Sequence, residues 1–161
     1  MAKRIVLWLN AFVAAVYFTG HLFDFLVLVP NWRAGDVEVI TRYRAFFVHT
    51  DPGAFFRFVV PATILLAIVS FLSYWKADKK LRLMLGAYLV LTLGAFLFTM
   101  FHFLPINGYL FWDKTIVLEP AKTMELAHSW ASGEQLRVAF GFVAMVVAGR
   151  ALHLSYSKPG H

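Results

Sequence analysis

The first long apolar run, from Ile5 to Pro30, constrains the fold of this chain most strongly. At about 1.5 Å per residue, a helix of this length spans more than the ~30 Å hydrocarbon core of a bilayer. Four polar residues interrupt the run at steps of seven, four and three residues, on one helical face: Asn10, Tyr17, His21 and Asp24. Because such a stripe avoids lipid, we predict a transmembrane helix whose polar face points at protein.

Composition supports a membrane protein of one domain, residues 1–161, since 60% of the chain is hydrophobic. The absence of cysteine excludes disulfides, thiolate metal sites and cysteine nucleophiles. The net charge of +6 comes from basic residues that flank apolar segments, so we expect a lipid bilayer and no nucleic acid as partner. The first run is about twice as long as the apolar part of a signal peptide, which favours a permanent helix.

Three further apolar segments complete an all-α integral membrane bundle of four transmembrane helices. The second is predicted from a cap at Asp51 to about Trp75, with a bend at Pro61. The third is predicted from a cap at Asp78 to Leu104, where Pro105 ends it.

The fourth helix is predicted to begin at the capping-box pattern Ser132-Gly133-Glu134-Gln135 and to continue to about Leu154. The two long connections, 31–50 and 105–131, should carry short interfacial helices, one of them from Pro120 to Ala131. We expect these connections to cover one end of the bundle like a lid.

Basic residues are densest in the short turn from Lys76 to Arg82 between the second and third helices. By the positive-inside rule this turn and both termini face the cytoplasm, and the two long connections lie outside. The expected location is a bacterial inner membrane.

This orientation places several polar groups in the outer half of the bundle. The third helix has a polar stripe at steps of four and three residues, which should face the stripe of the first: Tyr88, Thr92, Ala95, Thr99 and His102. Arg57 and Arg137 begin the second and fourth helices near the same side, and His49 and His128 lie in the covering loops. We therefore predict an outer-leaflet pocket open to a hydrophobic small molecule or a lipid.

Plainer interpretations exist for the same residues. Asp24 is equally explained as a buried structural partner of Arg57 or Arg137. Tyr88 and Thr99 are better explained by packing and hydrogen bonding between helices than by a ligand. His102 lies at the membrane boundary, where an imidazole needs no ligand.

Several short motifs, spread over most of the chain, resemble those of the small four-helix membrane proteins related to anthrone oxygenases. The shared features are Gly20 before an apolar run ending at Pro30, a Pro105-Ile106-Asn107 turn, Trp130, and Gln135-Leu136-Arg137. The chain departs from that pattern at Gly108, where the family commonly has a second Asn, and near Glu134, where a His is expected.

The resemblance implies oxidation of an electron-rich cyclic substrate, phenol-like or anthrone-like, by dioxygen, with no cofactor required. It then implies His21 or His102 as the base, oriented by Asp24, and Arg57, Asn107 or Arg137 as the group that stabilises the enolate. Trp130, Tyr88, Thr99 and His128 are the remaining candidates for contact with the substrate.

Two other functions fit the same sequence. The chain is equally suited to a non-catalytic role, as a small subunit or lipid-binding scaffold among other membrane subunits. It also suits an electron-transfer module, in which His21 and His102 ligate a haem or in which a metal ion is held by His21, Asp24, His102 and His49. Transport is a remaining alternative.

Overall fold

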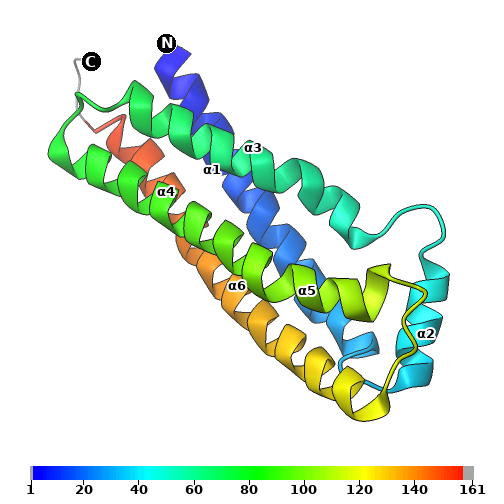
Figure 1. The fold of residues 1–161 in the computed structure, drawn as a ribbon. Helices are drawn as coiled ribbons and strands as arrows, with labels where there is room; N and C mark the ends of the chain where they lie inside the picture. The colour runs from blue at the N-terminus through cyan, green and yellow to red at the C-terminus, as the bar shows by residue number, and fades with distance from the viewer. Residues whose placement is uncertain (1, 158–161) are drawn as a thin grey trace.

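The computed structural model describes residues 2–157 and shows an elongated bundle of long α-helices (Figure 1). The long helices are α1 (Ala2–Phe23), α3 (Pro52–Ser73), α4 (Lys79–Phe98) and α6 (Pro120–Leu154). A shorter helix, α2 (Val37–Phe46), covers the end of the bundle away from the start of α1. The predicted all-α architecture is confirmed.

The first helix is longer than α1 alone. A π-helical turn, η1 (Asp24–Leu28), and a 3-10 turn, η2 (Val29–Asn31), continue it. The predicted stripe faces protein, because Asn10, Tyr17, His21 and Asp24 are all buried. A turn at Gly35 follows; the backbone there is left-handed, and a Cβ would lie 2.4 Å from the Cα of Met124.

The second and third helices begin at their predicted caps. The Asp51 carboxylate accepts a hydrogen bond from the backbone N–H of Ala54, and Asp78 caps α4 through the N–H of Lys80. Helix α3 ends at Ser73, close to the predicted end, and Pro61 lies inside it.

The predicted end of the third helix at Leu104 is wrong. The chain continues helically through η3 (Thr99–Phe103), α5 (Leu104–Asn107) and η4 (Gly108–Trp112). Pro105 lies in the first turn of α5, directly after the π-helical turn η3. A π-helical turn shifts the hydrogen-bond register, and the proline, which has no N–H, therefore adds to the helix without ending it.

The predicted start of the fourth helix at Ser132 is also wrong, because α6 is a single helix of 35 residues from Pro120. The expected interfacial helix from Pro120 to Ala131 forms its first turns. A stripe at alternating steps of four and three residues is buried along the whole of α6: Thr123, Ala127, Trp130, Glu134, Arg137, Gly141, Ala144, Ala148 and Ala151. Burial on both sides of residue 132 outweighs the local capping pattern.

The four long helices pack as a square in which α1 and α4 lie on one diagonal. Each of these two helices contacts both α3 and α6. Small buried side chains at the contacts, including Ala14, Ala67, Ala95 and Ala144, allow the backbones to approach closely. The polar stripes of α1 and α4 therefore meet in the interior of the bundle.

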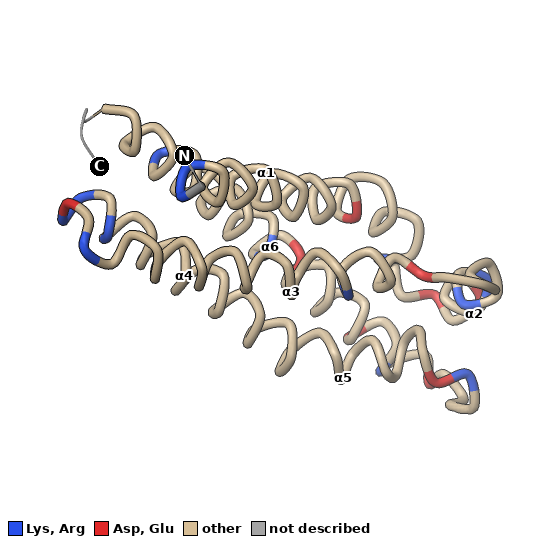
Figure 2. The backbone as a smooth tube through the Cα atoms, turned by 90° about the horizontal axis from the view of Figure 1, so that it is seen from above, with Lys and Arg blue, Asp and Glu red and all other residues tan. Residues whose placement is uncertain are grey.

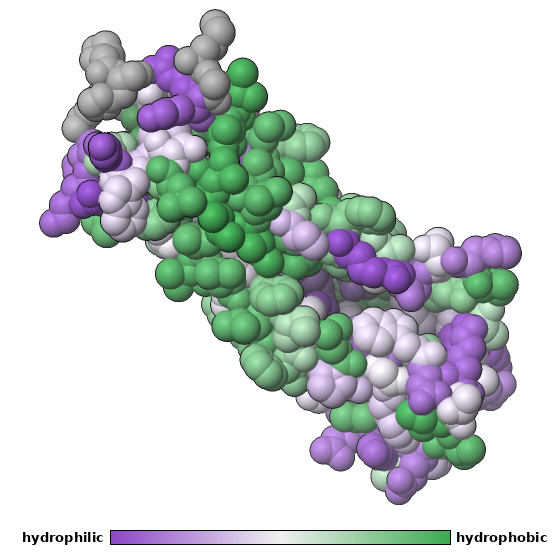
Figure 3. Space-filling model, turned by 45° about the horizontal axis from the view of Figure 1, so that its top comes forward, coloured by the Kyte–Doolittle hydropathy of each residue, from purple (hydrophilic) through white to green (hydrophobic). Residues whose placement is uncertain are grey.

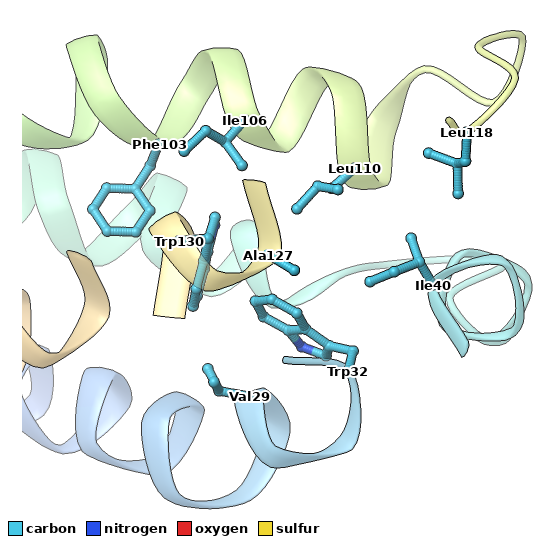
Figure 4. Close-up of a cluster of buried hydrophobic side chains, with 9 residues drawn as sticks. All are labelled: Val29, Trp32, Ile40, Phe103, Ile106, Leu110, Leu118, Ala127 and Trp130. Atoms are coloured by element: carbon cyan, nitrogen blue, oxygen red, sulfur yellow. The ribbon is translucent and has the colours of Figure 1, made fainter. Parts of the chain in front are cut away.

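The end of the bundle that carries α2 has its own apolar core, built around Trp32, Phe103 and Trp130 (Figure 4). Arg44 joins α2 to this core: its Nε donates to the carbonyl of Leu110 at 2.6 Å, and it also contacts the carbonyls of Tyr109 and Ile116. The bonds to Tyr109 and Leu110 satisfy carbonyls at the end of η4 that have no further helical turn to pair with, and Ile116 lies in the connection that follows.

Within residues 2–157, four helices are long and apolar enough to cross a membrane. On the face drawn in Figure 3, a broad band of hydrophobic side chains covers the middle of the molecule, and hydrophilic residues gather toward both ends. Several large side chains in this band are exposed, including Phe12, Phe58, Val90 and Phe101. These observations identify an integral membrane protein, because exposed apolar surface on every long helix needs lipid to cover it.

Candidate functional site

A buried cluster of three ionisable side chains joins α1 to α6. The Nδ1 atom of His21 lies 2.8 Å from Oε1 of Glu134. The other carboxylate oxygen of Glu134 accepts from Nε of Arg137 at 2.6 Å and also contacts Nη2 of the same guanidinium. Glu134 is fully buried, and His21 and Arg137 are 1% and 6% exposed. A buried charge this deep requires such pairing.

The hydrogen bonds define which nitrogen of His21 carries the proton. An ionised carboxylate only accepts, so Nδ1 must donate its proton to Glu134. In a neutral imidazole Nε2 then carries a free lone pair. Nε2 of His21 is buried and has no hydrogen-bond partner among the described residues. The ring stacks on Phe56 of α3 and meets the edge of Tyr17.

Aromatic rings hold the guanidinium of Arg137 on its other side. Its central carbon lies 3.3 Å from the centre of the Phe103 ring and 5.2 Å from that of Trp130. Cation–π attraction is strongest in a desolvated place such as this. The indole N–H of Trp130 in turn donates to Oδ1 of Asn107 at 2.6 Å. Asn107, Trp130 and Arg137 therefore form one connected wall of the site.

The cluster lies near one edge of the apolar band. His21 is about 27 Å along α1 from Lys3, and Glu134 is about 30 Å along α6 from Leu154, at ~1.5 Å per residue. Both distances are close to the ~30 Å thickness of a hydrocarbon core. Two π-helical turns, η1 and η3, begin at Asp24 and Thr99 beside this level. Such turns often occur at functional sites.

Other candidates from the polar stripes are buried nearby. Asp24 is 6% exposed, and Arg137 pairs with Glu134 rather than with this carboxylate. The pKa of Tyr43, on α2, is raised mainly by burial and next by the negative charge of Asp24. Asp24 therefore lies on the side of the cluster that faces α2.

Tyr88 lies on α4, about three turns before Thr99, which is the first residue of η3. The hydroxyl of Tyr88 has no hydrogen-bond partner among residues 2–157. Tyr88 lines a small interior cavity that residues of all four long helices enclose, Tyr17 among them. Thr99 donates to the carbonyl of Ala95 within its own helix.

Three candidates lie away from this cluster. Arg57 is exposed, and its guanidinium is 3.7 Å from the carboxylate of Asp51, not near Asp24. His49 and His128 are both exposed, one in the connection before α3 and one on α6.

His102 is neither part of the buried cluster nor fully exposed. Its ring is half-buried and stacks on Phe98, and Nε2 is 3.3 Å from the carbonyl of Ser129. Gly133 makes this approach possible, since a Cβ there would lie 2.7 Å from Nε2 of His102.

Residues 2–157 contain no group of three or more His, Asp or Glu side chains arranged to hold a metal ion. The four proposed ligands are dispersed: His49 is exposed, His102 contacts a backbone carbonyl, and His21 is bonded to Glu134. The residues present do not fit the predicted His21, Asp24, His102 and His49 site.

Sequence reasoning missed Glu134, which was interpreted as part of a helix cap. The heptad spacing would have revealed it, because Glu134 lies seven residues after Ala127 and seven before Gly141 in an otherwise small or apolar stripe. A carboxylate at such a position in a membrane helix must have a buried partner.

Comparison with known sequences adds one finding. The sequence model of a family described as anthrone oxygenase matches residues 53–147, which is more than half of the chain. The match includes Asn107, Trp130, Glu134 and Arg137, while His21 and Asp24 lie before it. Comparisons with curated proteins and with solved structures gave no match. The chain is thus a four-helix membrane protein that belongs to the anthrone oxygenase family.

Proposed function

We propose that this protein oxidises a hydrophobic, electron-rich cyclic substrate, phenol-like or anthrone-like, with dioxygen, and that His21 is the base. The observation that carries the proposal is the free Nε2 of a buried histidine whose Nδ1 is bonded to a carboxylate. This arrangement matches that of general bases oriented by a second group. Membership of the anthrone oxygenase family supports the substrate class.

Glu134, rather than Asp24, is the group that orients the base. It holds the imidazole with Nε2 unprotonated and stabilises the imidazolium that forms when Nε2 accepts a proton. Arg137 pairs with the Glu134 carboxylate and, with Asn107, offers positive charge and polarity for an enolate oxygen. Asp24 serves as a second carboxylate beside the site, and Arg57, which is exposed, takes no part.

The reaction balances without a further reactant. Nε2 of His21 removes a proton from an acidic CH₂ group of the substrate, and the carbanion transfers one electron to O₂. Coupling of the substrate radical and superoxide forms a C–O bond, and the peroxide takes the proton back from His21. Loss of water from the hydroperoxide, with cleavage of the O–O and remaining C–H bonds, leaves a ketone. CH₂ and O₂ thus become C=O and H₂O.

Access to Nε2 requires Phe56 to move, because its ring covers that of His21 at 4.4 Å between centroids. Phe56 belongs to the first turns of α3, which follow the non-helical segment 47–51. We propose that an aromatic substrate replaces Phe56 on the imidazole and enters between α1 and α3.

Oxygen uptake by the purified protein with anthrone tests this function. Wild-type protein should consume one O₂ per ketone formed, and His21→Gln should lower the rate about 100-fold or more, the usual range for loss of a general base. His102→Gln should have a much smaller effect. Equal rates for wild type and His21→Gln, with both proteins folded, would contradict the proposal.

A non-catalytic scaffold is the second candidate, and the nearly complete burial of the His21 ring favours it. In this role the cluster only stabilises the packing of α1 against α6 through the bonds of His21, Glu134 and Arg137. Absence of substrate-dependent oxygen uptake, with His21→Gln destabilising the fold, is the result expected of a scaffold.

A further inference from the structure

The opposite end of the bundle holds a groove that takes no part in the proposed reaction. It lies between the first turn of α1 and the end of α3, and its volume is about 430 Å³. It is lined by two lysines, a serine and two large apolar residues: Lys3, Lys76, Ser73, Leu72 and Trp75. It is therefore amphipathic and cationic.

Basic side chains outnumber acidic ones around this groove, where Asp78 is the acid nearest in sequence. The ion pairs found among the described residues include neither Lys3 nor Lys76. Lys and Arg residues gather at this end of the molecule, while the middle of the bundle holds few of them (Figure 2). Arg4 and Arg82 lie over the rings of Tyr156 and Trp75. An anion near the groove consequently meets a positive field from several directions.

The apolar residues in the lining favour a lipid over a free anion as the ligand of this groove. Leu72 and Trp75 are 64% and 53% exposed at the edge of the hydrophobic band. Lys3 lies with its Nζ 5.9 Å from the centre of the Tyr74 ring, a position typical of the interface between headgroups and acyl chains. A phosphate held by the two lysines would leave its acyl chains beside Leu72 and Trp75.

We propose that this groove binds the phosphate of an anionic phospholipid in the leaflet that surrounds the basic end of the bundle. Lys3 and Lys76 bind the phosphate, the Ser73 hydroxyl donates to it, and Leu72 and Trp75 contact the start of the acyl chains. The bound lipid joins α1 to α3 at the end remote from the His21 cluster.

Native mass spectrometry of the purified protein, titrated with phosphatidylglycerol or phosphatidylcholine, tests the site. Phosphatidylglycerol should remain bound to the wild type, and Lys3→Gln with Lys76→Gln should weaken that binding roughly tenfold or more, given two lysines near the phosphate. Lys79→Gln with Lys80→Gln removes the same charge at the same end but outside the groove, so its affinity should stay within about twofold. Lys3→Arg with Lys76→Arg should retain binding.

Three results would overturn the proposal. One is equal weakening by the two double Gln variants, which would mean attraction by net charge alone. Another is an affinity of the wild type for phosphatidylcholine equal to its affinity for phosphatidylglycerol. The third is displacement of the lipid by millimolar inorganic phosphate, which would indicate a site for soluble anions. Circular dichroism of each variant shows whether it is folded, and the Arg variant keeps the test valid if the Gln variant is not.

Discussion

At the scale of single residues, Glu134 connects the proposed chemistry to the stability of the fold. Its two carboxylate oxygens bind different partners, His21 on α1 and Arg137 on α6 itself. Removing its charge leaves a guanidinium buried among aromatic rings without the carboxylate to which it is hydrogen-bonded. Such an unpaired buried charge is far more costly than the loss of the whole pair.

We therefore expect Glu134→Gln to destabilise the protein by about 3 to 5 kcal/mol. The double variant Glu134→Gln with Arg137→Met should recover part of that loss, because no uncompensated charge remains. Thermal unfolding in detergent, followed by circular dichroism, measures both. A double variant less stable than Glu134→Gln would show that the guanidinium does not depend on this carboxylate.

Gly133 gives a steric prediction next to the same cluster. A Cβ at this position would lie 2.7 Å from His102 and 2.8 Å from Phe103, so Gly133→Ala should destabilise by about 1 to 3 kcal/mol. Gly149, on the same helix, has nothing within 4 Å of a Cβ, and Gly149→Ala should be neutral or slightly stabilising. Similar unfolding temperatures for the two variants would contradict the close packing of α6 on η3.

The sequence predicted the burial of His21 and Asp24, since both follow a helical stripe, and it placed Arg137 near the same side of the bundle. It did not predict their partners. Asp24 was expected to bind Arg57 or Arg137, but Arg137 binds Glu134 because the two are three residues apart on one helix face. Pairing across a bundle depends on the rotation and depth of each helix, which spacing alone does not determine.

At the scale of elements, the continuity of α6 decides where the cluster lies. If the fourth helix began at Ser132, Glu134 would be a capping residue; in the 35-residue helix it is an interior residue. Ser132→Pro distinguishes the two, because proline is tolerated in a first turn but costs about 3 kcal/mol inside a helix. We expect Ser132→Pro to unfold at a clearly lower temperature and Ser132→Ala, at this exposed position, to resemble the wild type. Equal stability of both variants would support a helix that begins at Ser132.

The start of a helix was predictable from the sequence where a local capping interaction determines it. Asp51 and Asp78 cap α3 and α4 as expected, since a capping carboxylate needs only the next few backbone N–H groups. The continuation past Pro105 was not predictable, because it depends on a π-helical turn that has no sequence signature here. Tertiary packing of Phe103 and Leu110 on the core around Trp130 stabilises that continuation.

At the scale of the whole molecule, α1 begins and α6 ends at the same end of the bundle, which is also the basic end (Figures 1 and 2). The positive-inside rule predicts that this end faces the cytoplasm. The chain lacks cysteine, so single cysteines report topology without background. In intact cells, an impermeant thiol reagent should label Lys114→Cys but not Lys80→Cys. Labelling of Lys80→Cys alone would reverse the orientation.

The membrane class and the four spans followed from composition and segment length, because the bilayer imposes both. The direct packing of α1 against α6 did not follow, since loop lengths constrain only neighbours in sequence. That association brings His21, which precedes the family match, next to Glu134, which lies inside it. The candidate site therefore exists only in the folded chain.

Hydrogen exchange at the acidic carbon of anthrone in D₂O, without oxygen, tests the central claim most directly. If Nε2 of His21 removes a proton before oxygen reacts, wild-type protein should accelerate deuterium incorporation over the rate without protein. His21→Gln should reduce that rate to the background, and His102→Gln should leave it nearly unchanged. Oxygen-dependent ketone formation with no accelerated exchange in the wild type would contradict the claim.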